Sequence, residues 1–96
     1  MHAVVRHYTG TDAKELFDLL EKRKADVEVH LRKVHGLVSY TLLRTGDGGT
    51  SVTVCKDKAG SDESMKVAHD WIQKNASNLH PKPPVVAEGS VIVEIK

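Results

Sequence analysis

The sequence lacks the features that cross-link a small protein or attach it to a membrane. It contains a single cysteine, Cys55, so no disulfide can form within the chain and no cysteine pair is present for a zinc ribbon. No apolar run approaches the roughly 20 residues that a membrane-spanning helix needs. Residues 1–7 lack the long apolar core of a signal peptide. These absences predict a cytoplasmic protein without a membrane partner.

An excess of one charge is also missing. The chain has 14 Lys and Arg against 13 Asp and Glu, a formal net charge of +1. Nucleic-acid-binding domains usually carry a large basic excess, so we expect no nucleic-acid partner. Hydrophobic residues make up 40% and charged residues 28%, as in folded globular proteins. At this length, residues 1–96 are expected to form a single domain.

The spacing of apolar residues predicts six elements. Residues 2–8 have the β-branched and aromatic composition of a strand, and the next segment has apolar residues at helical spacing. Thr11 or Asp12 is the expected N-cap of that helix, and Gly36 its C′ residue. The predicted elements are a strand over 2–8, a helix over 12–34, strands over 37–45 and 50–57, a helix opened by Ser61 and ended by Pro81, and a strand over 85–96 with a bulge at Gly89.

Three glycines within residues 46–49 raise the question of a phosphate-binding loop. Loops of the P-loop or Rossmann type need a helix N-terminus after the glycines, whereas a strand follows here. Asp47-Gly48 between two strands is instead typical of a β-hairpin turn. A two- or four-residue loop centred there places Leu43 opposite Val52, and a three-residue loop would shift that pairing.

The order of elements, β-α-β-β-α-β, is that of the ferredoxin-like split βαβ fold. It implies an α+β domain with a four-stranded antiparallel sheet and both helices on one face. The strands nevertheless carry apolar residues on both faces. These are Leu43, Val52 and Val54 on one face, and Val38, Tyr40 and Leu42 on the other. Because the helices cover only one face, we expect a homodimer in which two sheets pack together.

Two segments strengthen this assignment by resemblance. Residues 35–40, which lead into the second strand, and residues 52–57, which precede the second helix, resemble the dimeric α+β barrel superfamily. That group includes antibiotic-biosynthesis-monooxygenase-like proteins, haem-degrading monooxygenases and many small bacterial proteins of unknown role. The resemblance covers essentially the whole chain and implies the fold, whereas such a fold hosts unrelated chemistries.

The haem-degrading members of the group use an Asn on the first strand, a Trp on the second helix and a downstream His as the haem ligand. Here Arg6 and His7 occupy the strand, Trp71 falls about one turn late, and His80 adjoins Pro81 at the helix end. The six histidines show no ligand motif such as H-E-x-x-H. We therefore expect no cofactor and no bound metal.

The cofactor-independent monooxygenases of the group oxidise phenolic polyketides with Asn, Trp, Tyr and Arg side chains around a pocket. The same residue types give the candidate pocket-lining residues of this chain, which are Arg6, His7, Tyr40, Trp71 and Asn75. No spacing ties them together, and each has a structural alternative. A buried His7 could act as an acid or base, whereas a half-exposed one at a strand end has no such role. Trp71 could equally fill the core.

Three functions therefore stay open, and no catalytic residue is identified. The leading hypothesis is a homodimer whose cleft between helices and sheet binds a small apolar or aromatic molecule. The second is a cofactor-independent monooxygenase acting on an aromatic substrate, which needs polar groups converging on a cavity near Trp71. The third is a structural or interaction module whose cleft is filled by side chains.

Overall fold

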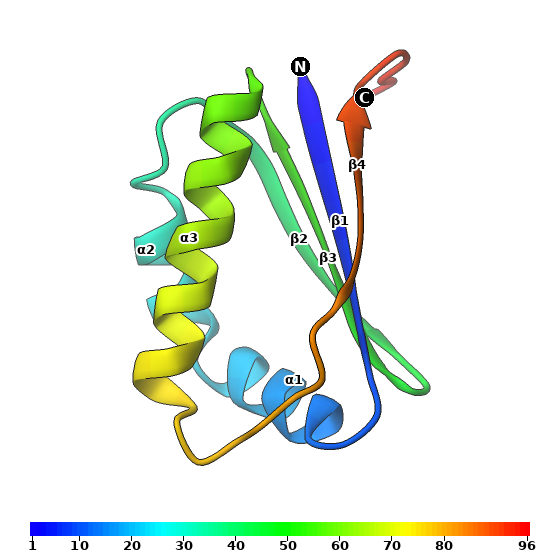
Figure 1. Cartoon of the computed structure of the whole chain (residues 1–96). Coiled ribbons are helices and arrows are strands. Elements are labelled where there is room, and N and C mark those ends of the chain that lie inside the picture. The colour runs from blue at the N-terminus through cyan, green and yellow to red at the C-terminus, as the bar shows by residue number, and fades with distance from the viewer.

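The computed structural model describes residues 1–96, which adopt an α+β fold. The elements are β1 (His2–Thr9), α1 (Ala13–Lys22), α2 (Lys24–Leu31), β2 (Leu37–Thr45), β3 (Gly48–Cys55), α3 (Lys58–Asn75) and β4 (Val85–Ser90). The four strands form one antiparallel sheet in the order β2-β3-β1-β4, and the helices cover one of its faces (Figure 1). This is the predicted ferredoxin-like fold. No helix has both the length and the apolar character to cross a membrane.

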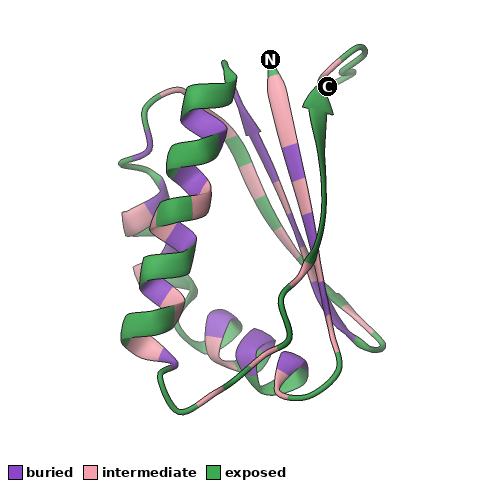
Figure 2. Cartoon of the chain, viewed as in Figure 1, coloured by how far each residue is buried: buried purple, intermediate pink, exposed green.

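Strand alternation decides which side chains meet the helices. On β1 the buried residues are Val4, Arg6 and Tyr8, while their neighbours in the strand are only partly buried. Cross-strand pairing places Ser51 opposite Arg6 and Thr53 opposite Val4, both nearly inaccessible on the same face. The burial colours of Figure 2 show this alternation along β1.

The apolar core lies between this face and the three helices. In it Phe17 packs against Tyr8 with their ring centroids 5.8 Å apart. A Cβ at Gly49 would lie 2.3 Å from the Phe17 ring, and one at Gly48 would lie 2.2 Å from the Tyr8 carbonyl oxygen. The glycines of β3 therefore make room for the core and for β1, and no helix follows them to form a phosphate loop.

The hairpin turn differs by one position from the predicted one. Its two-residue loop is Gly46-Asp47, and Thr45 pairs with Gly48. The predicted pairing of Leu43 with Val52 is wrong, because Leu43 pairs with Thr50. The cause is that Gly48 and Gly49 belong to β3, where a side chain at either position would clash with the Tyr8 carbonyl oxygen or the Phe17 ring. The shift at the turn is two residues, so Leu42 and Leu43 keep their predicted faces, whereas a register irregularity between Leu37 and Ser39 places Leu37 on the core side.

The helices also differ from the prediction at their ends. The first predicted helix is divided at Arg23, whose backbone leaves helical geometry with φ −106° and ψ 26°. Gly36 adopts a φ of +79° but lies beyond the end of α2, just before β2. α3 begins before Ser61, because the Asp57 carboxylate caps it by accepting a hydrogen bond from the Gly60 N–H at 2.9 Å.

The last strand is half as long as predicted. β4 ends at Ser90, and Gly89 pairs with Ala3 in regular register without a bulge. One more backbone bond follows, from the Val91 N–H to the Met1 carbonyl oxygen at 2.9 Å. The tail that leaves the sheet there exposes its large apolar side chains, which are Ile92, Val93 and Ile95.

The sheet face opposite the helices carries apolar side chains that this chain leaves partly or fully exposed. Val5 and Val52 pair directly across its centre, and neither is fully buried. Leu43 and Val85, on the two outer strands, are exposed on this face. An apolar second face was predicted from the sequence, and the register of all four strands is consistent with it.

Candidate functional site

A small cavity lies between the inner face of the sheet and the helices. Ten of its twelve lining residues are aliphatic or aromatic, and the other two are Arg6 and Ser51. Its volume is about 20 Å³. That is enough for one water molecule and too little for an organic ligand. In its present form the cavity is a gap in the core that carries two polar groups.

Both polar groups of the cavity are deeply buried, and each has one atom without a hydrogen-bond partner. Arg6 is 6% exposed and forms no ion pair, and its Nε has no hydrogen-bond acceptor. Ser51, its direct neighbour on β3, is 1% exposed, and its Oγ has no partner either. Burying a charge is costly unless it is paired and hydrogen-bonded. The cavity therefore contains a positive charge that no carboxylate of this chain neutralises.

Tyr40 reaches the same cavity from β2. Burial raises the pKa of its phenol above the usual value of 10.0, and the nearby positive charge of Arg6 opposes part of that rise. The phenol is thus neutral at physiological pH. Tyr40 cannot act as the counter-ion of Arg6, although its hydroxyl can serve as a polar contact for a ligand.

Trp71 forms a wall of the cavity from α3. Its indole N–H donates to the Asp26 carboxylate on α2 at 2.7 Å, and the Arg23 guanidinium lies 5.8 Å from the ring centroid. The indole hydrogen bond is the main reason that the pKa of Asp26 lies below its usual range. The ring is therefore held in place by both helix α2 and the α1–α2 junction.

The structure brings together three of the five residues singled out from the sequence, namely Arg6, Tyr40 and Trp71. The other two do not line the cavity. His7 follows Arg6 in β1, so it points to the opposite face, with its Nδ1 2.6 Å from Thr50 Oγ1. Asn75 uses its side-chain amide to donate to the Trp71 carbonyl oxygen at 3.0 Å. Ser51 was missed, although cross-strand pairing with Arg6 would have indicated it.

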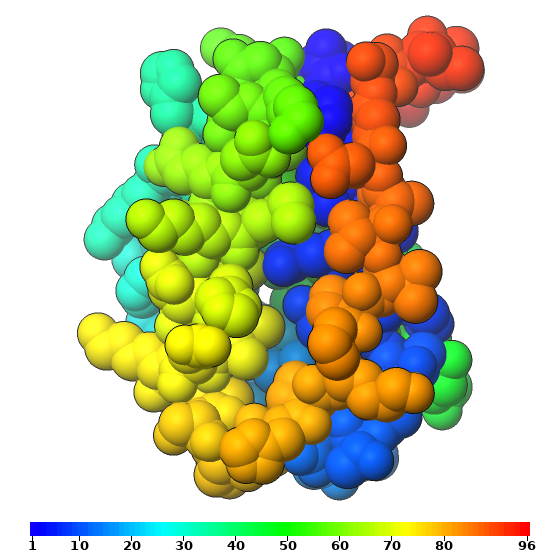
Figure 3. Space-filling view, viewed as in Figure 1, coloured from blue at the N-terminus to red at the C-terminus, as the bar shows by residue number.

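Two larger hollows adjoin the cavity. A groove of about 460 Å³ between α2 and β2 shares four lining residues with it: Val27, Leu31, Tyr40 and Leu42. A second hollow of about 600 Å³ lies between α3 and the segment that leads into β4, where the space-filling surface is hollowed (Figure 3). It shares Tyr8 and Ile72 with the cavity. Both volumes fall in the range typical of small-molecule sites.

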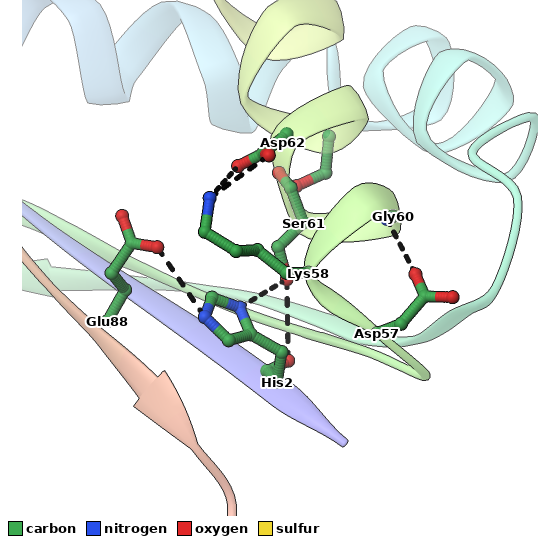
Figure 4. Close-up of polar contacts among 8 residues, drawn as sticks. His2, Asp57, Lys58, Gly60, Ser61, Asp62 and Glu88 are labelled. Carbon is green, nitrogen blue, oxygen red and sulfur yellow. Dashed lines mark hydrogen bonds and ion pairs between the residues drawn. The ribbon is translucent and has the colours of Figure 1, made fainter.

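A second polar cluster lies at the end of the sheet near the N-terminus (Figure 4). His2 Nδ1 is 2.9 Å from Ser61 Oγ, and His2 Nε2 is 3.5 Å from a Glu88 carboxylate oxygen. The arrangement has the residue types of a nucleophile, a base and an orienting acid. However, Ser61 is fully buried, and none of the three lines the cavity or the two hollows. The cluster fastens β1 and β4 to the start of α3.

Metal and haem ligands are not assembled around the cavity. No three His, Cys, Asp or Glu side chains are grouped to hold a metal ion. None of the histidines lines the cavity, so a haem there would have no imidazole ligand. His80 is exposed beyond α3, where its backbone N–H donates to the Asp12 carboxylate at 2.7 Å. The lining of the cavity therefore does not fit haem, whereas His69 and His80 line the hollow between α3 and the segment that leads into β4.

The sheet order and the helices on one face define a ferredoxin-like α+β protein. No protein-family model and no curated protein matches the sequence. Solved structures do match, among them a monooxygenase from the ActVA-Orf6 gene of Streptomyces coelicolor in complex with the ligand nanaomycin D. It is 19% identical, with a TM-score of 0.66 over 99% of this chain and 89% of that chain.

Two further matches cover nearly the whole of both chains. The haem degrader MhuD from Mycobacterium tuberculosis, solved with two haems bound in its active site, is 19% identical, with a TM-score of 0.68 over 100% of each chain. A dimeric ferredoxin-like protein from an uncultured marine organism is 16% identical, with a TM-score of 0.67 over 99% of this chain and 95% of that chain. At these identities the similarity shows the fold, and it confirms the predicted resemblance at that level.

Proposed function

We propose that the protein is a homodimer that binds a small aromatic molecule between its helices and its sheet. The observation that carries the proposal is the cavity between Tyr40 and Trp71, whose aromatic and aliphatic walls also hold unpartnered polar groups. Apolar walls with a few placed polar groups are typical of small-molecule sites. The fold supports the same proposal, since one protein of this fold is solved with nanaomycin D and another with two haems.

Binding requires the cavity to join the groove between α2 and β2. The partition between them consists of side chains on α2 and β2, and those on β2, Tyr40 and Leu42, are only partly buried. For the two spaces to join, α2, which has eight residues and is separated from α1 at Arg23, would have to shift relative to β2. A ligand would then occupy the groove and place one end in the present cavity.

The ligand proposal is tested by isothermal titration calorimetry with a neutral bicyclic probe, naphthalene-2-carboxamide. We expect measurable binding to the wild type and its loss in Leu42→Trp, which fills the partition. Val29→Trp is the matched control, because Val29 is 55% exposed on the outer side of α2. Failure of both this amide and 2-naphthoate to bind the wild type would favour an interaction module without a pocket. Equal binding to both variants would place the site elsewhere.

Self-association is supported by the apolar side chains exposed on the sheet face opposite the helices. A second copy of the chain would cover Val5, Val52 and Leu43 with the same residues of its own sheet, and the apolar tail over 91–96 lies free beside that face (Figure 1). The match to a dimeric ferredoxin-like protein supports this arrangement. The cytoplasmic location stays a prediction from the sequence.

The dimer is tested by light scattering coupled to size-exclusion chromatography. The wild type is expected at twice the chain mass. Leu43→Glu places a charge on the open face and should give the monomer mass, whereas Val29→Glu adds the same charge to an exposed helix position and should not. A monomeric wild type would contradict the proposal.

An oxygenase is the second candidate, favoured by the convergence of Arg6 and Tyr40 beside Trp71 on one cavity. It requires that the bound molecule be a phenol oxidised by molecular oxygen without a cofactor. An oxygen electrode with 1-naphthol as the probe would test it. Oxygen consumption that is lost in Tyr40→Phe would support the oxygenase, and binding without oxygen consumption would leave a binding protein.

A further inference from the structure

The charge of Arg6 is not balanced by any neighbouring side chain. On the inner face of the sheet, β3 offers the neutral Ser51 and β2 the neutral phenol of Tyr40. The helices contribute only aliphatic and aromatic side chains to the cavity. On β4, Arg6 pairs with Val86, and the nearest acid along that strand, Glu88, is engaged with His2 at 3.5 Å. No side chain that lines the cavity therefore supplies a negative charge to Arg6.

Water alone does not complete the site. A single molecule fits in about 20 Å³ and could hydrogen-bond to Arg6 Nε and Ser51 Oγ. It would satisfy the hydrogen bonds and leave the buried positive charge without compensation. An anion bound beside Arg6 would offset that cost.

We propose that the molecule bound here is an aromatic carboxylate, with its carboxylate against the Arg6 guanidinium and the Ser51 hydroxyl and its ring against Trp71. The inference rests on the proposed function and names the class of its ligand. A guanidinium pairs with a carboxylate through two parallel hydrogen bonds. Arg6 is the one cationic side chain of the cavity, which suits a monoanion better than a phosphate dianion. The Phe17 and Trp71 rings give the aromatic part of the ligand its walls.

A matched pair of probes tests the inference on the wild-type protein. Calorimetric titration at pH 7 compares 2-naphthoate with naphthalene-2-carboxamide, which has nearly the same shape and no charge. We expect the carboxylate to bind at least about tenfold more tightly, as for a charge-assisted hydrogen bond in a buried site. Equal affinities would overturn the inference and leave the proposed function intact. Failure of both probes to bind would overturn the proposed function as well.

Two variants then locate the preference. In Arg6→Met, 2-naphthoate should fall to the affinity of the amide, while the amide keeps its wild-type affinity. Arg44→Met removes the same charge from an exposed residue that is paired with Asp18 and Glu21, so it should keep the tenfold preference. A preference that survives Arg6→Met, or that disappears in Arg44→Met, would contradict a carboxylate site at Arg6. The wild-type comparison decides the matter even if a variant fails to fold.

Discussion

Two polar clusters lie on the helix-covered face of the same sheet, and they differ in how completely their hydrogen bonds are satisfied. In the cluster near the N-terminus, His2 contacts both Ser61 and Glu88. In the cavity, Arg6 and Ser51 lie side by side, with Arg6 Nε and Ser51 Oγ unpartnered. Ser51 and Ser61 are equally buried serines, so burial alone does not separate a structural polar group from a functional one.

The difference follows from what surrounds each cluster. At the N-terminal end, the start of α3 brings a hydroxyl to His2 and β4 brings a carboxylate (Figure 4). Around Arg6 the helices supply mainly Phe17, Leu20 and Trp71, which cannot accept a hydrogen bond as a carboxylate does. Folding explains the first cluster completely. The second cluster lowers the stability of the folded protein, and ligand binding can offset that loss.

The largest expected effect is on stability in Arg6→Met. Replacing an uncompensated buried cation by an apolar side chain of similar length should raise the free energy of unfolding by at least about 1 kcal/mol. Urea denaturation of the ligand-free protein measures it. A destabilised variant would mean that Arg6 has a structural partner, and the contrast between the two clusters would fail.

The next largest effect is a decrease in the free energy of unfolding. Ser61→Ala removes the partner of His2 and leaves a partly buried imidazole nitrogen unsatisfied, which should lower the free energy of unfolding by about 1–2 kcal/mol. Ser51→Ala removes a hydroxyl that has no partner, so we expect little loss from the same truncation. The same denaturation experiment compares the two, and equal losses would contradict the assignment of Ser51 as unsatisfied.

A smaller effect concerns the hydrogen bond that holds Trp71. The indole N–H foremost, with His30 and Arg23, keeps the pKa of Asp26 below its ordinary value of 3.8. A lowered pKa in the folded state gives stability that is present above 3.8 and is lost as the pH falls through the folded value. Asp26→Asn should therefore show a weaker acid-induced loss of stability. Thermal melts between pH 2 and 6 of both proteins measure it, and identical pH profiles would exclude this role.

The smallest effect is expected at Glu88. Its contact with His2 is long and its side chain is about one-third exposed, so Glu88→Gln should cost less than about 1 kcal/mol. The variant also tests the charge balance of the cavity. If Glu88 turned toward Arg6 in solution, Glu88→Gln would bind 2-naphthoate more tightly than the wild type. We expect unchanged affinity.

The fold was predictable from the sequence because the periodicity of the strands and the order of the elements are enough to indicate it. The same periodicity places Arg6 and His7 on opposite faces of β1, so only one of them could line the cavity. The turn position was not predictable from Asp47-Gly48 alone, because Gly48 and Gly49 are required by Tyr8 and Phe17, which are distant in the sequence. The start of α3 depends on an Asp57 cap that competes with an equally suitable serine.

The candidate site was predictable only in part. Arg6, Tyr40 and Trp71 were singled out by residue type, and their convergence depends on the packing of three separate elements. Ser51 resembles any polar residue of a half-exposed strand until its pairing with Arg6 is known. That Arg6 lacks a counter-ion cannot be seen in the sequence, because it depends on which acids the fold keeps away.

The most direct measurement follows the Nε–H resonance of Arg6 by ¹H–¹⁵N NMR, assigned by its absence in Arg6→Met. During titration with 2-naphthoate this resonance should shift with the same dissociation constant that calorimetry gives, and naphthalene-2-carboxamide should move it much less. A resonance that stays unchanged while 2-naphthoate binds would show that the ligand does not contact Arg6, and it would contradict the account of this cavity as a carboxylate site.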